Sequence, residues 1–198
     1  MAKHIFRGLA IILMLTLVAM LTAPTLLAAD IRSEETVMIA SEEIVNDDLY
    51  VSANTIIVDG TINGDLFAAA NTITINGVVN GNLFAAGSTV TVNGVVNGSV
   101  MAAAGRTVTI NGDIARAVRV AGETVNINGN VNHDVMVGCS EVAIASTAKI
   151  DGALFFGAGT AYVDGLIEGN IEGTGSEATL ADGVKGDVEL EVDKLTDR

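Results

Sequence analysis

The sequence predicts an all-β protein: a single-stranded parallel β-helix, or solenoid, with about 17 residues in each coil. Three observations predict this fold. A motif such as V-T-V-N-G-V-V-N-G-S-V recurs along the chain, apolar and polar residues alternate within it, and Asn-Gly pairs interrupt the alternation. A short fixed period is typical of repeat architectures. Alternation with a period of two is the pattern of a half-buried strand.

The motif has five clear copies in the middle of the chain. They begin at Ile56, Ile73, Val90, Val108 and Val125. The position of Gly64 recurs at spacings of 17, 17, 18, 17, 19, 17 and 17 residues, which places small insertions near residues 106–116 and 146–149. The chain therefore supplies seven or eight clear coils, with an irregular first coil before them at residues 31–48.

One copy of the motif shows why strands and corners are expected. Ile73 and Ile75 point to one side of a strand, while Thr74 points to the other. Asn76-Gly77 is a turn pair, because glycine accepts a positive φ and asparagine tolerates it. The β-branched residues and the paired corners oppose a helix. Each unit is therefore predicted to hold three short strands separated by tight corners.

Asn-Gly is also a hairpin signal, but hairpins would reverse the strand direction and leave equivalent residues unstacked. In a coil of parallel strands, each residue lies about 4.8 Å from its equivalent in the previous coil, and the coils share one core. The apolar residues then form continuous columns, one of which is Ile62, Val79, Val96, Ile114, Val131, Ile150, Ile167 and Val184. Stacked corner amides are predicted to hydrogen-bond along the axis, in the column Asn76, Asn93, Asn111 and Asn128.

The two ends of the chain differ from the repeats. Residues 1–29 combine basic residues with an uncharged stretch, which predicts a hydrophobic N-terminal helix: a secretory signal peptide or an uncleaved membrane anchor. Both alternatives place the solenoid outside the cytoplasm, because the positive end of such a segment stays inside. The solenoid is predicted over residues 30–190. Residues 191–198 are predicted to form a charged C-terminal tail.

The charge balance is strongly acidic. The formal net charge of the whole chain is −14, and residues 30–198 carry 24 acidic against 8 basic side chains. Nucleic-acid binding needs clustered Lys and Arg, so nucleic-acid partners are excluded. Acidic residues in both end coils should repel head-to-tail contacts. Those of the first coil, among them Glu42 and Glu43, are expected to guard the open end of the solenoid.

No catalytic, cofactor-binding or metal site is predicted. His133 is the only histidine after residue 29, and it replaces a corner glycine. Cys139 is the only cysteine, so it forms no internal disulfide, and we expect it to be a small buried residue. The corner acids stand singly, whereas metal ligands cluster. Arg106 should stack beside Glu123 in the next coil and form a surface ion pair.

Two outward-facing surfaces are candidates for binding. An apolar ridge, interrupted by Arg119, is predicted to mediate self-association, because an exposed apolar strip marks a contact surface; covering by the N-terminal segment is the alternative. The ridge contains Phe67, Phe84, Met101, Met136 and Phe155. Threonine pairs form a flat array that resembles the ice-binding face of some β-solenoid antifreeze proteins, although threonine is also a good strand residue. This face contains Thr72, Thr74, Thr89, Thr91, Thr107 and Thr109.

The repeats V-D-G-T-I-N-G-D-L-F-A, I-N-G-V-V-N-G-N-L-F-A and I-D-G-A-L-F-F-G resemble those of the bactofilin family of polymer-forming bacterial cytoskeletal proteins. The resemblance covers roughly residues 44–190. It implies a right-handed, triangular β-helix that polymerises end to end without a nucleotide. This chain departs from the family in two features. Bactofilins are typically cytoplasmic or bound to the inner face of the membrane, whereas this chain carries an export-like N-terminal segment. Bactofilins also keep apolar residues near their stacking ends, whereas both end coils of this chain are acidic.

These observations predict a non-enzymatic scaffold in the bacterial cell envelope that forms a homo-oligomer or polymer and associates with the membrane through its N-terminal segment. A secreted module that binds ice or a glycan through the threonine face is the alternative. A carbohydrate-active enzyme is disfavoured, because acids and bases do not cluster on one face of the coils.

Overall fold

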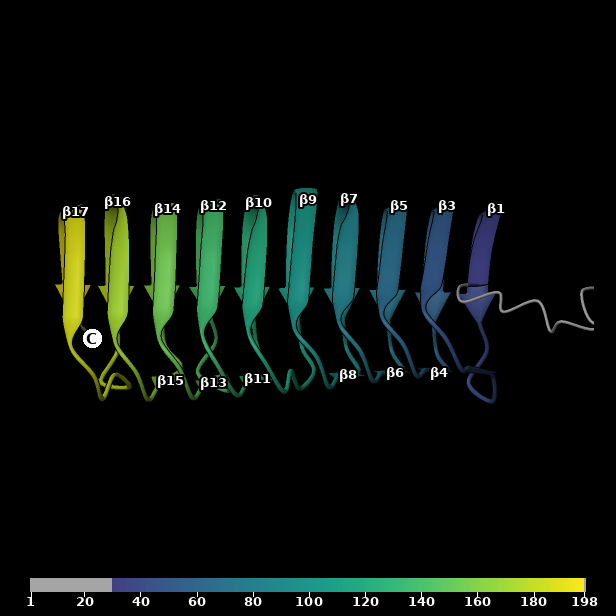
Figure 1. The fold of residues 1–198 in the computed structure, drawn as a ribbon. Helices are drawn as coiled ribbons and strands as arrows, with labels where there is room; N and C mark the ends of the chain where they lie inside the picture. The colour runs from purple at the N-terminus through teal and green to yellow at the C-terminus, as the bar shows by residue number, and fades with distance from the viewer. Residues whose placement is uncertain (1–29, 198) are drawn as a thin grey trace, which may run out of the picture.

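The computed structural model describes residues 30–197, which form a parallel β-solenoid of about ten coils (Figure 1). The predicted solenoid is thus confirmed. The hydrophobic helix predicted for residues 1–29, as a signal peptide or anchor, lies outside the described residues. Within residues 30–197 there is no helix with the length and hydropathy needed to cross a membrane.

Each coil contributes one long strand to a ten-stranded parallel sheet, in which the strands follow one another in chain order. These strands are β1 (Asp30–Ile39), β3 (Leu49–Val58), β5 (Leu66–Ile75), β7 (Leu83–Val92), β9 (Val100–Ile110), β10 (Val118–Ile127), β12 (Val135–Ile144), β14 (Leu154–Val163), β16 (Ile171–Leu180) and β17 (Val188–Asp197). Two-residue strands form two further parallel sheets. They are β2 (Ile44–Val45), β4 (Thr61–Ile62), β6 (Val78–Val79) and β8 (Val95–Val96), and then β11 (Asn130–Val131), β13 (Lys149–Ile150) and β15 (Leu166–Ile167).

Each long strand contains a corner, which the burial pattern reveals. In β5 the buried residues alternate over residues 66–70 and again over 73–75, so the alternation changes phase at Asn71 and Thr72. The sequence predicted three separate short strands in each coil. The structure joins the first two into one strand, because pairing with the neighbouring coil continues on both sides of the corner. The third is the two-residue strand.

The coils stack in register, as the 17-residue period predicts. Ile73 pairs with Val90 and Ile75 with Val92 in the next coil. The apolar columns are confirmed, and the column from Ile62 to Ile167 is fully buried. Both predicted insertions are confirmed as well. One shifts the register at the bend of β9, and the other lies between β12 and β13, where the pairing distance rises from 17 to 19 residues.

Corner glycines allow close approach between coils. No residue in the described part, glycine included, has a positive φ, so the expectation that these glycines adopt one is wrong. A Cβ atom added at Gly112 would lie 1.8 Å from the carbonyl oxygen of Gly94 in the previous coil. At Gly94 the same addition would lie 1.9 Å from the carbonyl oxygen of Gly77. Only a hydrogen atom fits between these stacked corners.

Stacked asparagines hydrogen-bond along the solenoid axis, as predicted. The Nδ2 of Asn93 donates to the Oδ1 of Asn76 at 2.8 Å, and the Nδ2 of Asn111 donates to the Oδ1 of Asn93 at 2.7 Å. A second ladder contains Asn46, Asn63, Asn80 and Asn97. Because an amide both donates and accepts, each ladder can pass from coil to coil and oppose a change of register.

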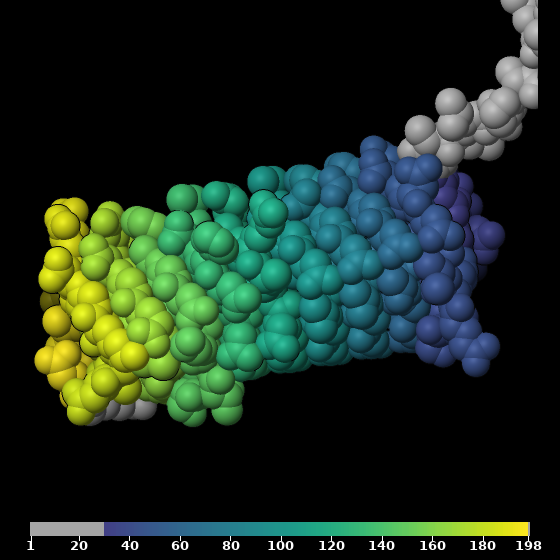
Figure 2. Space-filling view, turned by 60° about the horizontal axis from the view of Figure 1, so that its bottom comes forward, coloured from purple at the N-terminus to yellow at the C-terminus, as the bar shows by residue number. Residues whose placement is uncertain are grey.

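The solenoid extends beyond its predicted C-terminal boundary. Residues 191–197, expected to be a charged tail, belong to β17, which pairs in register with β16. The charges misled the prediction because Glu189 and Glu191 occupy alternate, outward-facing positions: both are exposed, whereas Leu190 and Val192 are partly buried. Figure 2 shows the described residues as one continuous rod from the first coil to the last.

Candidate functional site: two unlike ends and an apolar groove

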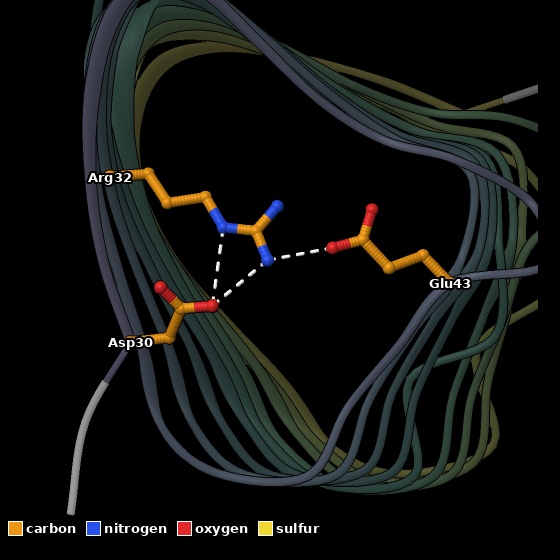
Figure 3. Close-up of polar contacts among 3 residues, drawn as sticks. All are labelled: Asp30, Arg32 and Glu43. Atoms are coloured by element: carbon orange, nitrogen blue, oxygen red, sulfur yellow. Dashed lines mark hydrogen bonds and ion pairs between the residues drawn. The ribbon is translucent and has the colours of Figure 1, made fainter. Parts of the chain in front are cut away.

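Three charged side chains lie across the N-terminal end of the solenoid. Asp30 and Arg32 occupy inward-facing positions of β1, because they pair with the buried residues Leu49 and Val51 of the next coil. The Nη2 of Arg32 donates to the Oδ2 of Asp30 at 2.8 Å and to the Oε1 of Glu43 at 2.6 Å. Figure 3 shows these side chains pointing toward one another across the outline of the coils.

We call these three side chains the charged cap. The side chain of Arg32 is 27% exposed, and those of Asp30 and Glu43 are 39% and 35% exposed. Hydrogen bonds, first to Asp30 and then to Glu43, raise the pKa of Arg32 above its ordinary value, so the guanidinium stays charged. Glu43 is one of the acidic residues expected to guard this end. The apolar core of the first coil is well covered, since Val37 is only 3% exposed.

The C-terminal coil presents apolar side chains instead. Val188 and Leu195 occupy inward-facing positions of β17, because they pair with the buried residues Ile171 and Ala178, yet they are 45% and 50% exposed. Leu195 ends the column that begins with Val37. Both end coils were expected to repel contacts through their acidic residues. In β17, Glu189, Glu191 and Asp193 face outward, and Val188 and Leu195 give the end of the core an apolar surface. Asp197 is the exception, because it pairs with the buried Leu180 and occupies an inward-facing position.

The predicted apolar ridge is a continuous row on the outer surface. Phe67 pairs with Phe84 in the next coil, and Phe84 pairs with Met101. The ring of Phe67 stacks on those of Tyr50 and Phe84, with centroid distances of 4.5 and 4.6 Å and interplanar angles of 3°. In chain order the ridge consists of Tyr50, Phe67, Phe84, Met101, Arg119, Met136 and Phe155.

A row of small exposed residues runs beside the ridge, two residues further along each strand. This small-residue row consists of Ser52, Ala69, Ala86, Ala103, Ala121, Gly138 and Gly157. The ridge, the small-residue row and the inward-facing residues between them line an open groove of about 950 Å³. The groove extends from Ile31 in β1 to Gly138 in β12, and its lining is almost entirely apolar.

The predicted threonine pairs lie in register on three adjoining coils. Thr72, Thr89 and Thr107 form one row. Thr74, Thr91 and Thr109 form the second row, and all six are partly exposed. The first row continues on both sides through Thr36, Thr55 and Thr124. The second row does not, because Ile57 and Asn126 occupy the neighbouring positions.

Side chains with potential chemistry are scattered. His133 is exposed at a corner. Cys139 is partly buried, and burial, followed by the nearby Glu141, raises the pKa of its thiol to about 11, so the thiol is protonated at neutral pH. Among residues 30–197, no three His, Cys, Asp or Glu side chains gather as a metal-binding group.

The ion pair predicted between Arg106 and Glu123 is wrong. The Nε of Arg106 instead donates to the Oγ of Ser88 in the previous coil at 3.1 Å. Arg106 lies at the insertion in β9, where the pairing with β10 shifts register. Because of this shift, the side chain of Arg106 does not lie beside that of Glu123 in the next coil.

Two parts of these surfaces were missed in the sequence. Tyr50 lies 17 residues before Phe67, so the period alone could have placed it on the ridge. The charged cap was harder to find. Asp30 pairs with a residue 19 positions later, whereas Ile44 pairs with one 17 positions later. The two extra residues between them hid the fact that Asp30 and Arg32 face inward.

No match to this chain was found among protein-family models, curated proteins or solved structures.

Proposed function

We propose that this chain is a non-enzymatic structural scaffold whose solenoid associates with further copies of itself. The observation that carries the proposal is the contrast between the two ends. The N-terminal coil has its charged cap, whereas the C-terminal coil exposes Val188 and Leu195 at positions that are buried in the eight coils between the first and the last. Exposed apolar surface at such positions favours a contact that covers it.

The contact is expected between two C-terminal ends. β17 is the last strand of the sheet, so one edge of its backbone is unpaired within the described residues, and such edges readily pair with another strand. Glu189, Glu191 and Asp193 face outward around this end. Their repulsion opposes the contact, and salt should relieve it, because charges are screened over about 10 Å at 0.1 M ionic strength.

The proposal also includes features that come from the bactofilin resemblance and from residues 1–29. These are a right-handed, triangular coil, a location outside the cytoplasm in the cell envelope, and membrane association through the N-terminal segment. The corner within each long strand and the separate two-residue strand support three sides for the coil. The strongly acidic surface supports the absence of a nucleic-acid partner.

The test uses the full-length chain in sedimentation velocity and negative-stain electron microscopy across salt concentrations. The variant Val188→Asp/Leu195→Asp places charge on the apolar end and should abolish end-to-end association. Thr196→Asp adds a charge to an outward position of the same strand and is the matched control, which should associate like the wild type. End-to-end association that persists in the double variant, or a wild type that stays single at every salt concentration, would contradict the proposal.

A secreted binding module that meets ice or a glycan through the threonine face is the second candidate. The first threonine row, with six members on successive coils from Thr36 to Thr124, favours it. Thermal hysteresis of the purified protein tests ice binding. The variant Thr91→Tyr should abolish any hysteresis, because a bulky side chain would break the flatness of the array.

A further inference from the structure

We infer that the groove beside the ridge is a docking site for a second copy of this chain, arranged side by side, parallel and in register. This inference rests on the proposed role in self-assembly and adds a second, lateral contact to it. In this arrangement the ridge of each copy packs into the small-residue row of the other.

The shape of each coil is self-complementary on this face. Every coil from β3 to β14 carries a ridge residue and, two positions later, a small residue at the same height, such as Phe84 and Ala86. A two-fold axis parallel to the solenoid axis and midway between the two rows places each ridge residue over the small residue of the same coil in the partner. An antiparallel arrangement instead sets ridge against ridge.

The solenoid itself does not require such small residues. A Cβ atom added at Gly138 would meet no atom within 4 Å, and one added at Gly157 would meet only the Oγ1 of Thr174, at 3.9 Å. The corner glycines, by contrast, are fixed by backbone atoms that leave no room for a side chain. Glycine within a strand costs stability relative to alanine, so these two positions are small for a reason that lies outside the fold of one copy.

The charge distribution favours a second copy on this face. In a chain with a net charge of −14, the ridge and the small-residue row contain no acidic residue from β3 to β14, and Arg119 is their only charged member. The next coil continues the ridge with Glu172, and the last coil continues it with Glu189. Two copies therefore approach with least repulsion along the groove, and the acidic residues mark where the contact stops.

The size of the contact sets its strength. Seven coils spaced by about 4.8 Å give a strip about 29 Å long, and two rows with their flanks are about 14 Å wide. The two copies together bury about 800 Å², less than the roughly 1,200 Å² at the low end of stable interfaces. The lateral contact is therefore weak by itself. It forms where the local concentration of copies is high, and end-to-end association raises that local concentration.

The test is cysteine crosslinking in the full-length chain with Cys139→Ala as background. Ser52→Cys lies in β3 and Gly157→Cys in β14, about 29 Å apart along one copy, farther than a short bismaleimide reaches. Parallel, in-register pairing predicts crosslinks between two Ser52→Cys chains and between two Gly157→Cys chains. Differently tagged chains, one of each kind, should not crosslink. Crosslinks only in the mixed pair, or none at all, would overturn the inference.

Ala86→Arg tests whether the groove itself makes the contact. A charge buried against the partner's ridge should lower the crosslink yield at least about tenfold. Thr91→Arg adds the same charge to the other side of the same strand, β7, and should leave the yield unchanged. Equal yields in both variants would overturn the inference. The double variant Val188→Asp/Leu195→Asp, measured at raised protein concentration, separates the two contacts. End-to-end association can fail while the lateral crosslinks still form, and the lateral crosslinks can fail while end-to-end association still forms.

Discussion

Arg32 shows how one side chain can end a repeat. In the nine later coils, its column contains only apolar residues and glycine, from Val51 to Leu190. A guanidinium at such a position would be costly inside the core. At the first coil it meets Asp30 and Glu43, and its hydrogen bonds to both carboxylates compensate for its partial burial.

Arg32→Ala should lower the free energy of unfolding by about 1 kcal/mol, because the pair is partly exposed and its loss leaves two carboxylates facing each other. The pKa of Arg32 is raised above its ordinary, strongly basic value, so its contribution is lost only at very high pH, and the effect should be constant between pH 6 and 9. Urea denaturation measures it. Arg116→Ala, at an exposed corner, is the control and should be neutral. Equal losses in both variants would rule out a specific role for the cap.

The thiol of Cys139 should react slowly with iodoacetamide in the folded protein. Its pKa is raised to about 11, so the reactive thiolate is scarce at pH 8, and the rate should rise steeply toward pH 11. The urea-unfolded chain is the control and should react fast near pH 9. The raised pKa also predicts that stability is lost as the pH rises from about 9 to 11, because only the unfolded chain ionises in that range. A folded rate equal to the unfolded rate at pH 8 would contradict this prediction.

At the scale of the element, the strands were predictable and the corners only partly so. Alternation such as Ile73, Thr74, Ile75 depends on side chains alone, and it placed the inward and outward faces correctly. The corner at Asn71 has no Asn-Gly pair, so nothing in its composition marked it as a bend within a strand. The Asn-Gly corners were found, but their glycines were explained by a positive φ, when the stacking distance between coils is what requires them.

Two glycine substitutions separate these explanations. Gly112→Ala should lower the free energy of unfolding by about 3 kcal/mol, because its Cβ would overlap the carbonyl oxygen of Gly94. Gly138→Ala lies on open surface within β12 and should raise stability by about 0.5 kcal/mol. Urea denaturation of both variants provides the measurement. A neutral effect of Gly112→Ala would mean that the corners have room that the structure does not show.

The whole molecule behaves as a one-dimensional stack, because each long strand pairs only with the strands of the adjacent coils. Its period, columns and ridge followed directly from the repeated motif. Its ends did not, since charge counts describe both as acidic. Which side chains face inward depends on the register of the terminal coils, which the two extra residues near Ala40 change at one end. The groove could not be predicted from the sequence, because its depth depends on the ridge and the small-residue row together.

Removal of one coil should leave the fold intact. Deleting residues 75–91 takes out one 17-residue period and joins Thr74 to Val92, which preserves the alternation. The circular dichroism spectrum should remain that of a β protein, and the urea m value should fall by about a tenth, in proportion to the buried surface.

Deleting residues 75–90 is the matched control. It removes one residue fewer, so Thr91 would face inward and Val92 outward. Marked destabilisation is expected in this variant alone. Similar stability of the two deletions would argue against a strict 17-residue register.

The charged cap also makes the two ends of the rod different and thereby limits the length of an assembly. If two copies join through their apolar C-terminal ends, both outer ends of the pair carry caps, and elongation along the axis stops. Each copy then spans nine steps of about 4.8 Å, or about 43 Å, between its cap and the joint. Such a pair is a molecular ruler, in which the number of repeats sets the distance between its ends in increments of one coil.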